Sequence, residues 1–434
     1  MNLSIVILAA GKGSRMKSPK AKVLHEICGK EMLYYSIKAA RAITDDVIVV
    51  VAHQKDRVVP AMQGYFDDLT FVEQDTENFP GTGGAMMGIQ PKYDNVLVLN
   101  GDMPLIETKS IEAFIHHLDD IVMSVIPLEN PSGYGRVVIE DGKVERIVEE
   151  KDASADEKRV NTVNAGVYAF KKEMLETYIP RLSNDNAQQE YYLTDVIEMA
   201  QKEGRSIVPL YVTEEEFKGV NSKYDLANAE RLMMERIRRK WMDAGVIMQL
   251  PETIYIEESV EFEGECVIEN GVRITGKSFI SHSHIKANSI VEESIVRDSD
   301  VGPLAHLRPQ SVLESTHIGN FVEVKKSTLK GVKAGHLSYL GDATIDEGTN
   351  IGAGTITCNY DGKKKYQTII GKNVFVGSDT HIVAPVEIAD NVMIAAGTTV
   401  TSGKYESDTL ILSRIPVKTV AGFFSRFFGK ADEC

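Results

Sequence analysis

A glycine turn followed by cationic side chains is the first candidate for chemistry. The turn, Gly11-Lys12-Gly13-Ser14-Arg15, directly follows the apolar run from Leu3 to Ala10, and Lys22 comes seven residues after Arg15. Glycines let the backbone approach a ligand closely, and successive N–H groups in such a turn can hold an anion. The pattern is neither a P-loop nor G-x-G-x-x-G, and by itself such a turn is as often structural as ligand-binding.

Two further loops favour a nucleotide and metal site. Gln74 precedes the flexible loop Pro80-Gly81-Thr82-Gly83-Gly84, and Asp102 lies just beyond the apolar run from Val96 to Leu99. Ligands bind at the carboxyl ends of parallel strands, and a carboxylate together with phosphate oxygens is a usual Mg²⁺ site. Asp102 alone is as well explained as a helix cap or turn residue, but the three loops together favour the functional interpretation.

His336 is the candidate general base of the second half. A histidine can act as a base near neutral pH, although a histidine between glycines is more often a structural hydrogen-bond partner. Polar residues near interruptions of the local repeat favour the catalytic role, and Arg308, Lys325 and Lys365 together could hold a sugar phosphate. We interpret His282 and His284 as surface residues. The other polar residues of this group are Glu323, Tyr339, Asn350, Asn359 and Tyr360.

In the first half of the chain, which carries the loops of the nucleotide site, strand patterns alternate with helix patterns. Apolar runs at 3–10, 47–52 and 96–99 alternate with helical spacing at 32–42 and 110–118. Strands without polar alternation that are separated by helices predict a parallel sheet covered on both faces.

The second half has a different period. A repeat of six residues fits neither an amphipathic helix nor a simple hairpin, but it fits a hexapeptide β-helix whose stacked coils share one core. A chance run of aliphatics is improbable because three partial runs repeat the pattern. The polar stretch 357–368 leaves the coil and is expected to project as a loop. The most regular aliphatic positions are Ile370, Val376, Ile382, Ile388, Ile394 and Val400.

Composition excludes several classes of protein. The chain has 434 residues and a net charge of −15, which argues against broad contact with nucleic acid or an anionic membrane. Four widely spaced cysteines exclude a disulfide framework and a cysteine zinc site of familiar spacing. No apolar run is long enough to span a bilayer, and MNLSIVILAA is better explained as a buried strand than as a signal peptide, so we expect a cytoplasmic protein.

The motifs resemble those of the sugar-nucleotidyltransferase family. L-A-A-G-K-G-S-R, P-G-T-G and G-D-M-P-L occur in family order. With its repeat-bearing second half, the chain is similar from Met1 to about Arg414 to the family of bifunctional bacterial enzymes that join an N-acetylglucosamine-1-phosphate uridyltransferase to a glucosamine-1-phosphate acetyltransferase. Further matches are Gly133-Tyr134-Gly135-Arg136, Glu149-Glu150-Lys151-Asp152, Asn164-Ala165-Gly166, Glu190-Tyr191-Tyr192-Leu193-Thr194-Asp195 and Gly219-Val220-Asn221.

The resemblance implies the fold class and the domains. The fold is α/β: an N-terminal Rossmann-like nucleotidyltransferase domain followed by a C-terminal left-handed parallel β-helix of hexapeptide repeats. The expected domains are 1–227 for the nucleotidyltransferase, 228–247 for a linker helix, 248–415 for the acetyltransferase and 416–434 for a tail. A basic helix can bind nucleic acid, but a connector is the favoured interpretation of the linker.

The resemblance also assigns roles in the nucleotide site of the first half, which we call the front site. A phosphate oxygen of N-acetylglucosamine 1-phosphate attacks the α-phosphorus of UTP, and pyrophosphate leaves. Asp102 and Asn221 hold Mg²⁺, while Arg15 and Lys22 stabilise the phosphates. The chain departs from the family pattern at Ala21, where proline is usual. The remaining contacts to UDP-N-acetylglucosamine fall to Leu8, Ala9, Ala10, Gly11, Gln74, Gly81 and Thr82 on the uridine side and to Gly135, Glu149 and Asn164 on the sugar side.

In the site of the second half, which we call the back site, the resemblance makes His336 the general base, with Glu323 assisting. Arg308, Lys325, Tyr339 and Asn350 would bind glucosamine 1-phosphate. The acetyl donor is acetyl-CoA, and the family is trimeric with sites between subunits. The tail is expected to dock on its own trimer, without firm membrane contact. The residues assigned to acetyl-CoA are Asn359, Tyr360, Lys365, Ser378, Ala396 and Arg414.

Two alternatives remain. A nucleotidyltransferase with a solenoid that only forms oligomers predicts a short solenoid without a base and phosphate clamp. A non-catalytic interaction protein does not need Arg15, Lys22 and Asp102 together. Both fit the sequence less well than the bifunctional enzyme.

Overall fold

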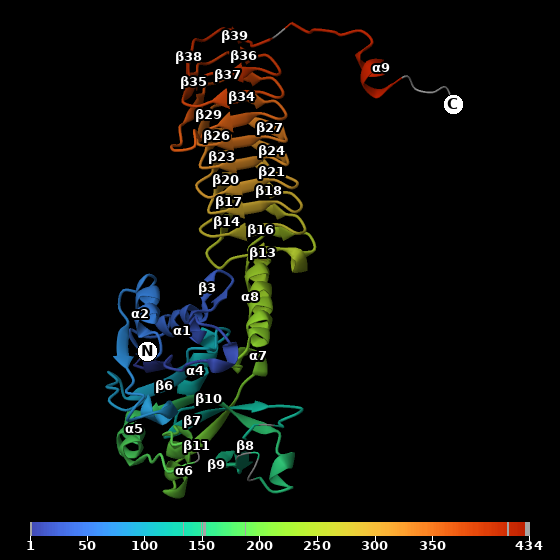
Figure 1. The fold of residues 1–434 in the computed structure, drawn as a ribbon. Helices are drawn as coiled ribbons and strands as arrows, with labels where there is room; N and C mark the ends of the chain where they lie inside the picture. Colours follow the sequence, from blue (N-terminus) through green and yellow to red (C-terminus); the bar gives the residue numbers. More distant parts are fainter. Residues whose placement is uncertain are drawn as a thin grey trace. The chain divides into compact units, whose positions relative to one another are not determined.

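The protein forms two compact units that divide between Arg236 and Ile237. The computed structural model describes residues 2–132, 134–148, 150, 153–186, 188–414 and 416–429 (Figure 1). The first unit is a sheet with helices on both faces, and the second is a stack of short strands.

The sheet of the first unit has the strand order β11-β7-β10-β6-β1-β4-β5, with β8 and β9 attached to β10. The predicted apolar runs are observed as β1 (Ser4–Leu8), β4 (Asp46–Val51) and β6 (Asn95–Asn100), which pair in parallel. The other strands are β5 (Thr70–Glu73), β7 (Ile121–Pro127), β8 (Arg136–Glu140), β9 (Lys143–Val148), β10 (Thr162–Lys171) and β11 (Ile207–Tyr211).

The predicted parallel pairing holds for these three strands but does not extend to β10. This strand lies between β6 and β7 and runs antiparallel to both. The chain reaches β10 through the β8–β9 hairpin rather than through a crossover helix, so it enters the sheet from the opposite end.

Helices cover both faces of this sheet, as predicted. Alternate residues of β1 enter two separate cores, with Ile5 and Ile7 in one and Val6 in the other. This two-sided burial explains why the strand lacks polar alternation. The first core includes residues of α1 (Met32–Arg41), α2 (Lys55–Gln63) and α4 (Thr108–His116), and the second includes residues of α5 (Lys172–Tyr178) and α6 (Thr194–Lys202).

The predicted connector is α8 (Lys223–Asp243), which begins before Asn228. Its apolar stripe is buried, with Met233 and Ile237 less than 10% exposed. Arg238 donates to the backbone oxygens of Pro251 and Ile254 at 2.8 and 3.2 Å. This basic side chain is therefore engaged within the protein.

The second unit is the predicted β-helix. Every third strand joins the same sheet, which gives three flat faces. The first face runs from β12 (Ile247–Met248) to β39 (Leu410–Ile411), the second from β13 (Tyr255–Ile256) to β37 (Thr399–Val400), and the third from β14 (Glu261–Glu263) to β38 (Gly403–Tyr405). All six of the most regular aliphatic positions are at most 1% exposed.

The irregular spacing after Phe279 reflects shorter sides of the coil. Ile280, Ile285 and Val291 are consecutive buried positions, so one side has five residues and the next has six. The strands stay in register, since Phe279 pairs with Ile295 on the next coil. The core therefore tolerates a corner that is one residue shorter.

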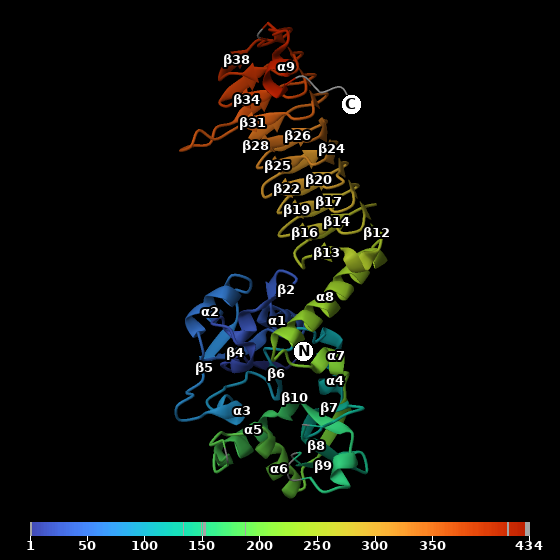
Figure 2. The same ribbon diagram turned by 45° about the vertical axis from the view of Figure 1, so that its right-hand side comes forward.

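The loop predicted at 357–368 and the tail both leave the coil. The predicted loop lies between β31 (Ile356–Cys358) and β32 (Thr368–Ile370), and Figure 2 shows it projecting from the stack. The tail contains a short helix, α9 (Phe423–Phe428), whose four phenylalanines are all more than half exposed, and its docking stays a prediction. Within the described residues, no helix is both long and apolar enough to cross a membrane.

Candidate functional site

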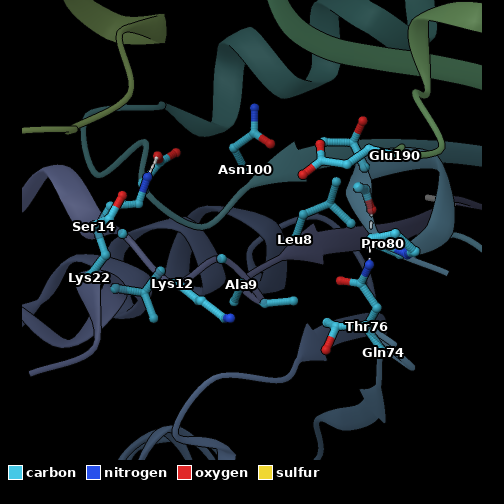
Figure 3. Close-up of a pocket in the computed structure, with 18 residues that line it drawn as sticks. Leu8, Ala9, Lys12, Ser14, Lys22, Gln74, Thr76, Pro80, Asn100 and Glu190 are labelled. Atoms are coloured by element: carbon cyan, nitrogen blue, oxygen red, sulfur yellow. Dashed lines mark hydrogen bonds and ion pairs between the residues drawn. The ribbon is translucent and has the colours of Figure 1, made fainter. Parts of the chain in front are cut away.

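A cavity of about 570 Å³ opens at the carboxyl ends of β1 and β6. The glycine turn and the loop around α3 (Gly81–Gly84) form two of its walls. Figure 3 shows Lys22 and Gln74 on opposite sides of this cavity. Nine of the residues assigned from the sequence line it: Leu8, Ala9, Ala10, Gly11, Lys22, Gln74, Gly81, Thr82 and Asp102.

Lys22 is the centre of a polar cluster at one end of this cavity. Its ammonium forms an ion pair with Asp102, and both side chains are only 15% exposed. The same ammonium donates to Asn221 Oδ1 at 3.1 Å, and Arg15 donates to that oxygen at 2.8 Å. The structure therefore brings together all four residues that the sequence assigned to phosphate and metal chemistry.

Local backbone geometry preserves the position of Lys22. Ala21 has φ −52°, within the range that proline adopts, so the missing proline does not change the turn. Its N–H also donates to Gln54 Oε1 at 3.2 Å, a bond that proline could not make. Lys22 then begins a short 3₁₀ turn, Lys22–Leu24.

A second cavity, of about 590 Å³, adjoins the same cluster. Lys22, Asn100 and Asp102 line both cavities, so the cluster lies where they meet. Arg15, Asn164 and Asn221 line the second cavity, as the sequence assignments require. Of the other two sugar residues, Gly135 lines neither cavity; Glu149 lies outside the described residues.

Gln74 is fixed by the loop that it faces. Its Nε2 donates to the backbone oxygens of Phe79 and Gly81, each at 2.9 Å. The amide nitrogen is therefore engaged, and Oε1 is the atom left to accept a hydrogen bond from a ligand (Figure 3). Thr82 Oγ1 accepts from the N–H of Leu193 at 3.1 Å and ties the loop to a neighbouring segment.

The donor set fits a magnesium ion. Asp102 offers a carboxylate and Asn221 an amide oxygen, and both oxygens already point at one cation, the Lys22 ammonium. Hard oxygen ligands of this kind suit Mg²⁺, which usually binds one or two protein carboxylates together with phosphates. In the part of the chain that the structure describes, no group of three or more His, Cys, Asp or Glu side chains is arranged so that it could hold a metal ion.

In the β-helix, the second face gathers a cluster of charges. Arg308 on β22 (His306–Arg308) pairs in register with Lys325 on β25 (Glu323–Lys325). Arg308 also donates to Glu323 Oε1 at 2.8 Å. Among the described contacts, Glu323 pairs with Arg308 and not with His336.

Three cations in this cluster repel one another. Arg308 and then Lys365, with some burial, hold the pKa of Lys325 below its usual range. An anion placed among them would relieve that repulsion. Asn359 lies beside Tyr339, because a side chain on Gly341 would meet both of them. The structure thus joins Arg308, Lys325, Tyr339, Asn359 and Lys365 in one site.

His336 ends β27 (Lys333–His336) on the first face and is exposed. The inward-facing partners along this face are Ala334, Ile351, Val376, Ile394 and Ile411, each one coil beyond the last. The first four are buried and Ile411 is partly buried. The residue two positions after each of them stands at the same corner of the coil. This corner column includes His336, Ser378 and Ala396, and Arg414 follows directly after its last position.

Asn350 is not brought to the same site within one chain. It lies on β30 (Asn350–Ile351) of the first face, where it pairs with Lys333 at the opposite end of the strand from His336. Tyr360 is 59% exposed and pairs with Lys365 across the projecting loop. Sequence reasoning therefore grouped Asn350 with side chains on a different face.

Some lining residues were missed by the sequence assignments. Lys218 and Glu214 line the second cavity and form an ion pair at 2.9 Å, and Glu190 lines the first. Glu214 holds the pKa of Lys218 above its usual range. The signal was available for Lys218, because it directly precedes the Gly219-Val220-Asn221 match.

Comparison with known proteins identifies the family. A model described as a MobA-like NTP transferase domain matches residues 5–160, and one described as bacterial transferase hexapeptide (six repeats) matches residues 367–402. The chain is 65% identical over 428 residues to the bifunctional protein GlmU of Sulfurimonas denitrificans, covering 99% of both chains. It is 63% identical over 431 residues to that of Wolinella succinogenes, covering 99% of this chain and all of the relative. The chain belongs to the GlmU family.

GlmU membership confirms the predicted pairing of a nucleotidyltransferase with a hexapeptide-repeat acetyltransferase. The predicted function, a bifunctional uridyltransferase and acetyltransferase of UDP-N-acetylglucosamine synthesis, is likewise confirmed. UTP and acetyl-CoA are therefore the co-substrates.

Proposed function

We propose that the two units perform successive reactions at the residues described above. The second unit transfers an acetyl group from acetyl-CoA to the amine of glucosamine 1-phosphate. The first unit then transfers UMP from UTP to N-acetylglucosamine 1-phosphate and releases pyrophosphate. The observation that carries the front assignment is that Lys22 and Asp102 line both cavities, because phosphoryl transfer needs charge where two substrates meet.

In the front reaction, the phosphate oxygen of the sugar attacks the α-phosphorus of UTP in line with the departing pyrophosphate. Such transfer needs positioning and charge neutralisation rather than a covalent intermediate. Arg15 and Lys22 bind the phosphate oxygens and stabilise their charge as it develops. Asp102 and Asn221 hold Mg²⁺, which supplies further neutralisation when it is bound.

The fixed amide of Gln74 supports uracil as the base. Its free Oε1 accepts a hydrogen bond, and the N3 position of uracil is a donor. The N3 position of cytosine is an acceptor, so CTP would place two acceptors against each other. A site built around such a bond rejects the mismatched ligand strongly, because a buried polar group is left unpaired. UTP is therefore favoured over CTP.

In the back reaction, the cations Arg308, Lys325 and Lys365 hold the phosphate of glucosamine 1-phosphate. His336 removes a proton from the sugar ammonium so that the amine can attack the thioester, and Glu323 assists from the next face. The corner column supports an extended acetyl-CoA along the coil, with Ser378, Ala396 and Arg414 beyond the base.

A second copy of the chain completes this site in our proposal. Asn350 lies on the first face, so it reaches the sugar phosphate only from another subunit. Apolar side chains along the corner next to His336 support such packing, because Leu304, Phe321 and Leu337 are 43%, 57% and 62% exposed. A homotrimer, as in the resemblance, places three such sites between subunits.

Omission of single components tests the whole scheme. The purified protein is mixed with glucosamine 1-phosphate, acetyl-CoA, UTP and Mg²⁺, and CoA and pyrophosphate are measured separately. Chelation of Mg²⁺ should stop pyrophosphate release and leave CoA release intact. Pyrophosphate release without acetyl-CoA, from glucosamine 1-phosphate and UTP alone, would contradict the proposed order of reactions.

A further inference from the structure

An arginine of the connecting helix α8 bridges two loops of the first unit. Arg236 donates from Nη1 to the backbone oxygen of Leu105 at 2.6 Å. The same guanidinium lies 3.4 Å from Glu107 Oε1 and 3.7 Å from Glu215 Oε1. Glu107 directly precedes α4, while Glu215 belongs to α7 (Glu214–Phe217).

The two bridged loops are joined again close to the chemistry. The N–H of Glu107 donates to Glu216 Oε1 at 2.7 Å, and the N–H of Val220 donates to the backbone oxygen of Asp102 at 2.9 Å. A Cβ on Gly219 would lie 3.2 Å from Asp102 Oδ1, so the backbone of this loop rests against the carboxylate. The position of Asn221 therefore depends on how the loops meet.

The charges at this junction favour the bridge. Glu107, Glu215 and Glu216 all lie at the junction of the two loops, and Arg236 is the cation from α8 that faces them. Lys109 also lies nearby, and it pairs with the second oxygen of Glu107 from an exposed position. Without Arg236, like charges from the two loops repel each other, which favours their separation.

We propose that Arg236 is a positioning residue for uridyl transfer: it holds the loop of Asp102 against the loop of Asn221 so that their oxygens can share one cation. It touches neither substrate, and the inference rests on the proposed front site. Because both oxygens must bind the same ion, the rate of uridyl transfer depends on their separation. A shift of about 1 Å can cost on the order of 100-fold in rate.

The test compares three full-length variants. Arg236→Gln removes the charge, Arg236→Lys restores it without the forked geometry, and Arg239→Gln is the control on the same helix, where Arg239 is 80% exposed and 3.8 Å from Asp243. Arg236→Gln should lower kcat for uridyl transfer by about tenfold and raise the half-saturating Mg²⁺ concentration by a similar factor. Arg236→Lys should be intermediate, and acetyl transfer should be unchanged in all three.

Hydrogen–deuterium exchange of the substrate-free protein gives a readout that does not depend on catalysis. Amides at 102–107 and 216–221 should exchange faster in Arg236→Gln than in Arg239→Gln, while the β-helix is unaffected. Unchanged exchange, or a kcat and Mg²⁺ dependence equal to those of Arg239→Gln, overturns the inference. If Arg236→Gln does not fold, Arg236→Lys is judged by the same criteria. Absence of uridyl transfer in the parent chain overturns the proposed function instead, and the exchange data still test the bridge.

Discussion

Replacement of Lys22 by methionine separates the two activities most sharply. Methionine keeps the length and apolar stem of lysine but removes the charge. The ammonium lies 3.1 Å from Asn221 Oδ1, so a phosphate oxygen in that place would interact with it by about 5 kcal/mol at an effective dielectric constant of 20. Loss of the remaining hydration offsets only part of this energy, because the side chain is already only 15% exposed, and about 3–4 kcal/mol remains.

This energy corresponds to a fall of about 10²–10³-fold in kcat/KM for uridyl transfer, measured as pyrophosphate release. The substitution also leaves the partly buried Asp102 without its ion pair, so the free energy of unfolding of the front unit should drop by about 1–2 kcal/mol. Acetyl transfer, measured as CoA release, should not change. Lys20→Met is the matched control. Lys20 lies two residues before Lys22 and forms an exposed ion pair with Glu26.

A Lys22→Met protein that stays within tenfold of Lys20→Met in uridyl transfer would refute the electrostatic argument. Equal loss of both activities would show instead that the two units do not act independently.

Three further predictions concern the back site and the domain boundary. His336→Ala should lower acetyl transfer by about 10²-fold or more and spare uridyl transfer. CoA release near the parent rate would show that His336 is not the base. Because Arg308 and Lys365 lower the pKa of Lys325, its positive charge is lost at a lower pH than that of an ordinary lysine. KM for glucosamine 1-phosphate should therefore rise earlier with increasing pH than in Lys365→Gln, and identical profiles would contradict this. A fragment of residues 1–243 should keep uridyl transfer, whereas an inactive or insoluble fragment would argue against this boundary.

The sequence was most informative where local pattern and tertiary environment agree. Strand β1 was predictable because both of its faces are buried, which leaves an uninterrupted apolar run. The direction of β10 was not predictable, since its own residues read like those of any buried strand. Its direction depends on the β8–β9 hairpin, which the periodicity does not reveal.

The candidate sites show the same contrast. Gln74 directly follows a strand and Asp102 comes two residues after one, so the edge of the sheet at which they lie could be inferred from the sequence. The face of Asn350 could not, because sides of five and six residues alternate irregularly, and a count along the chain loses track of the corner. In the sequence, Arg236 is one of several basic residues on a predicted helix, and nothing there points to its partners because they come from distant segments.

The corner column makes the coil a molecular ruler. Successive strands lie about 4.8 Å apart, and four steps separate the level of His336 from that of Arg414, so the two ends stand about 19 Å apart along the axis. Deleting one complete turn between them would keep each inward side chain stacked on an equivalent one, and the shortened prism should still fold. If acetyl-CoA lies along the column as proposed, the residues at its far end would then stand nearly 5 Å too close to the thioester. The length of the coil, rather than any single contact, would then limit the rate of acetyl transfer.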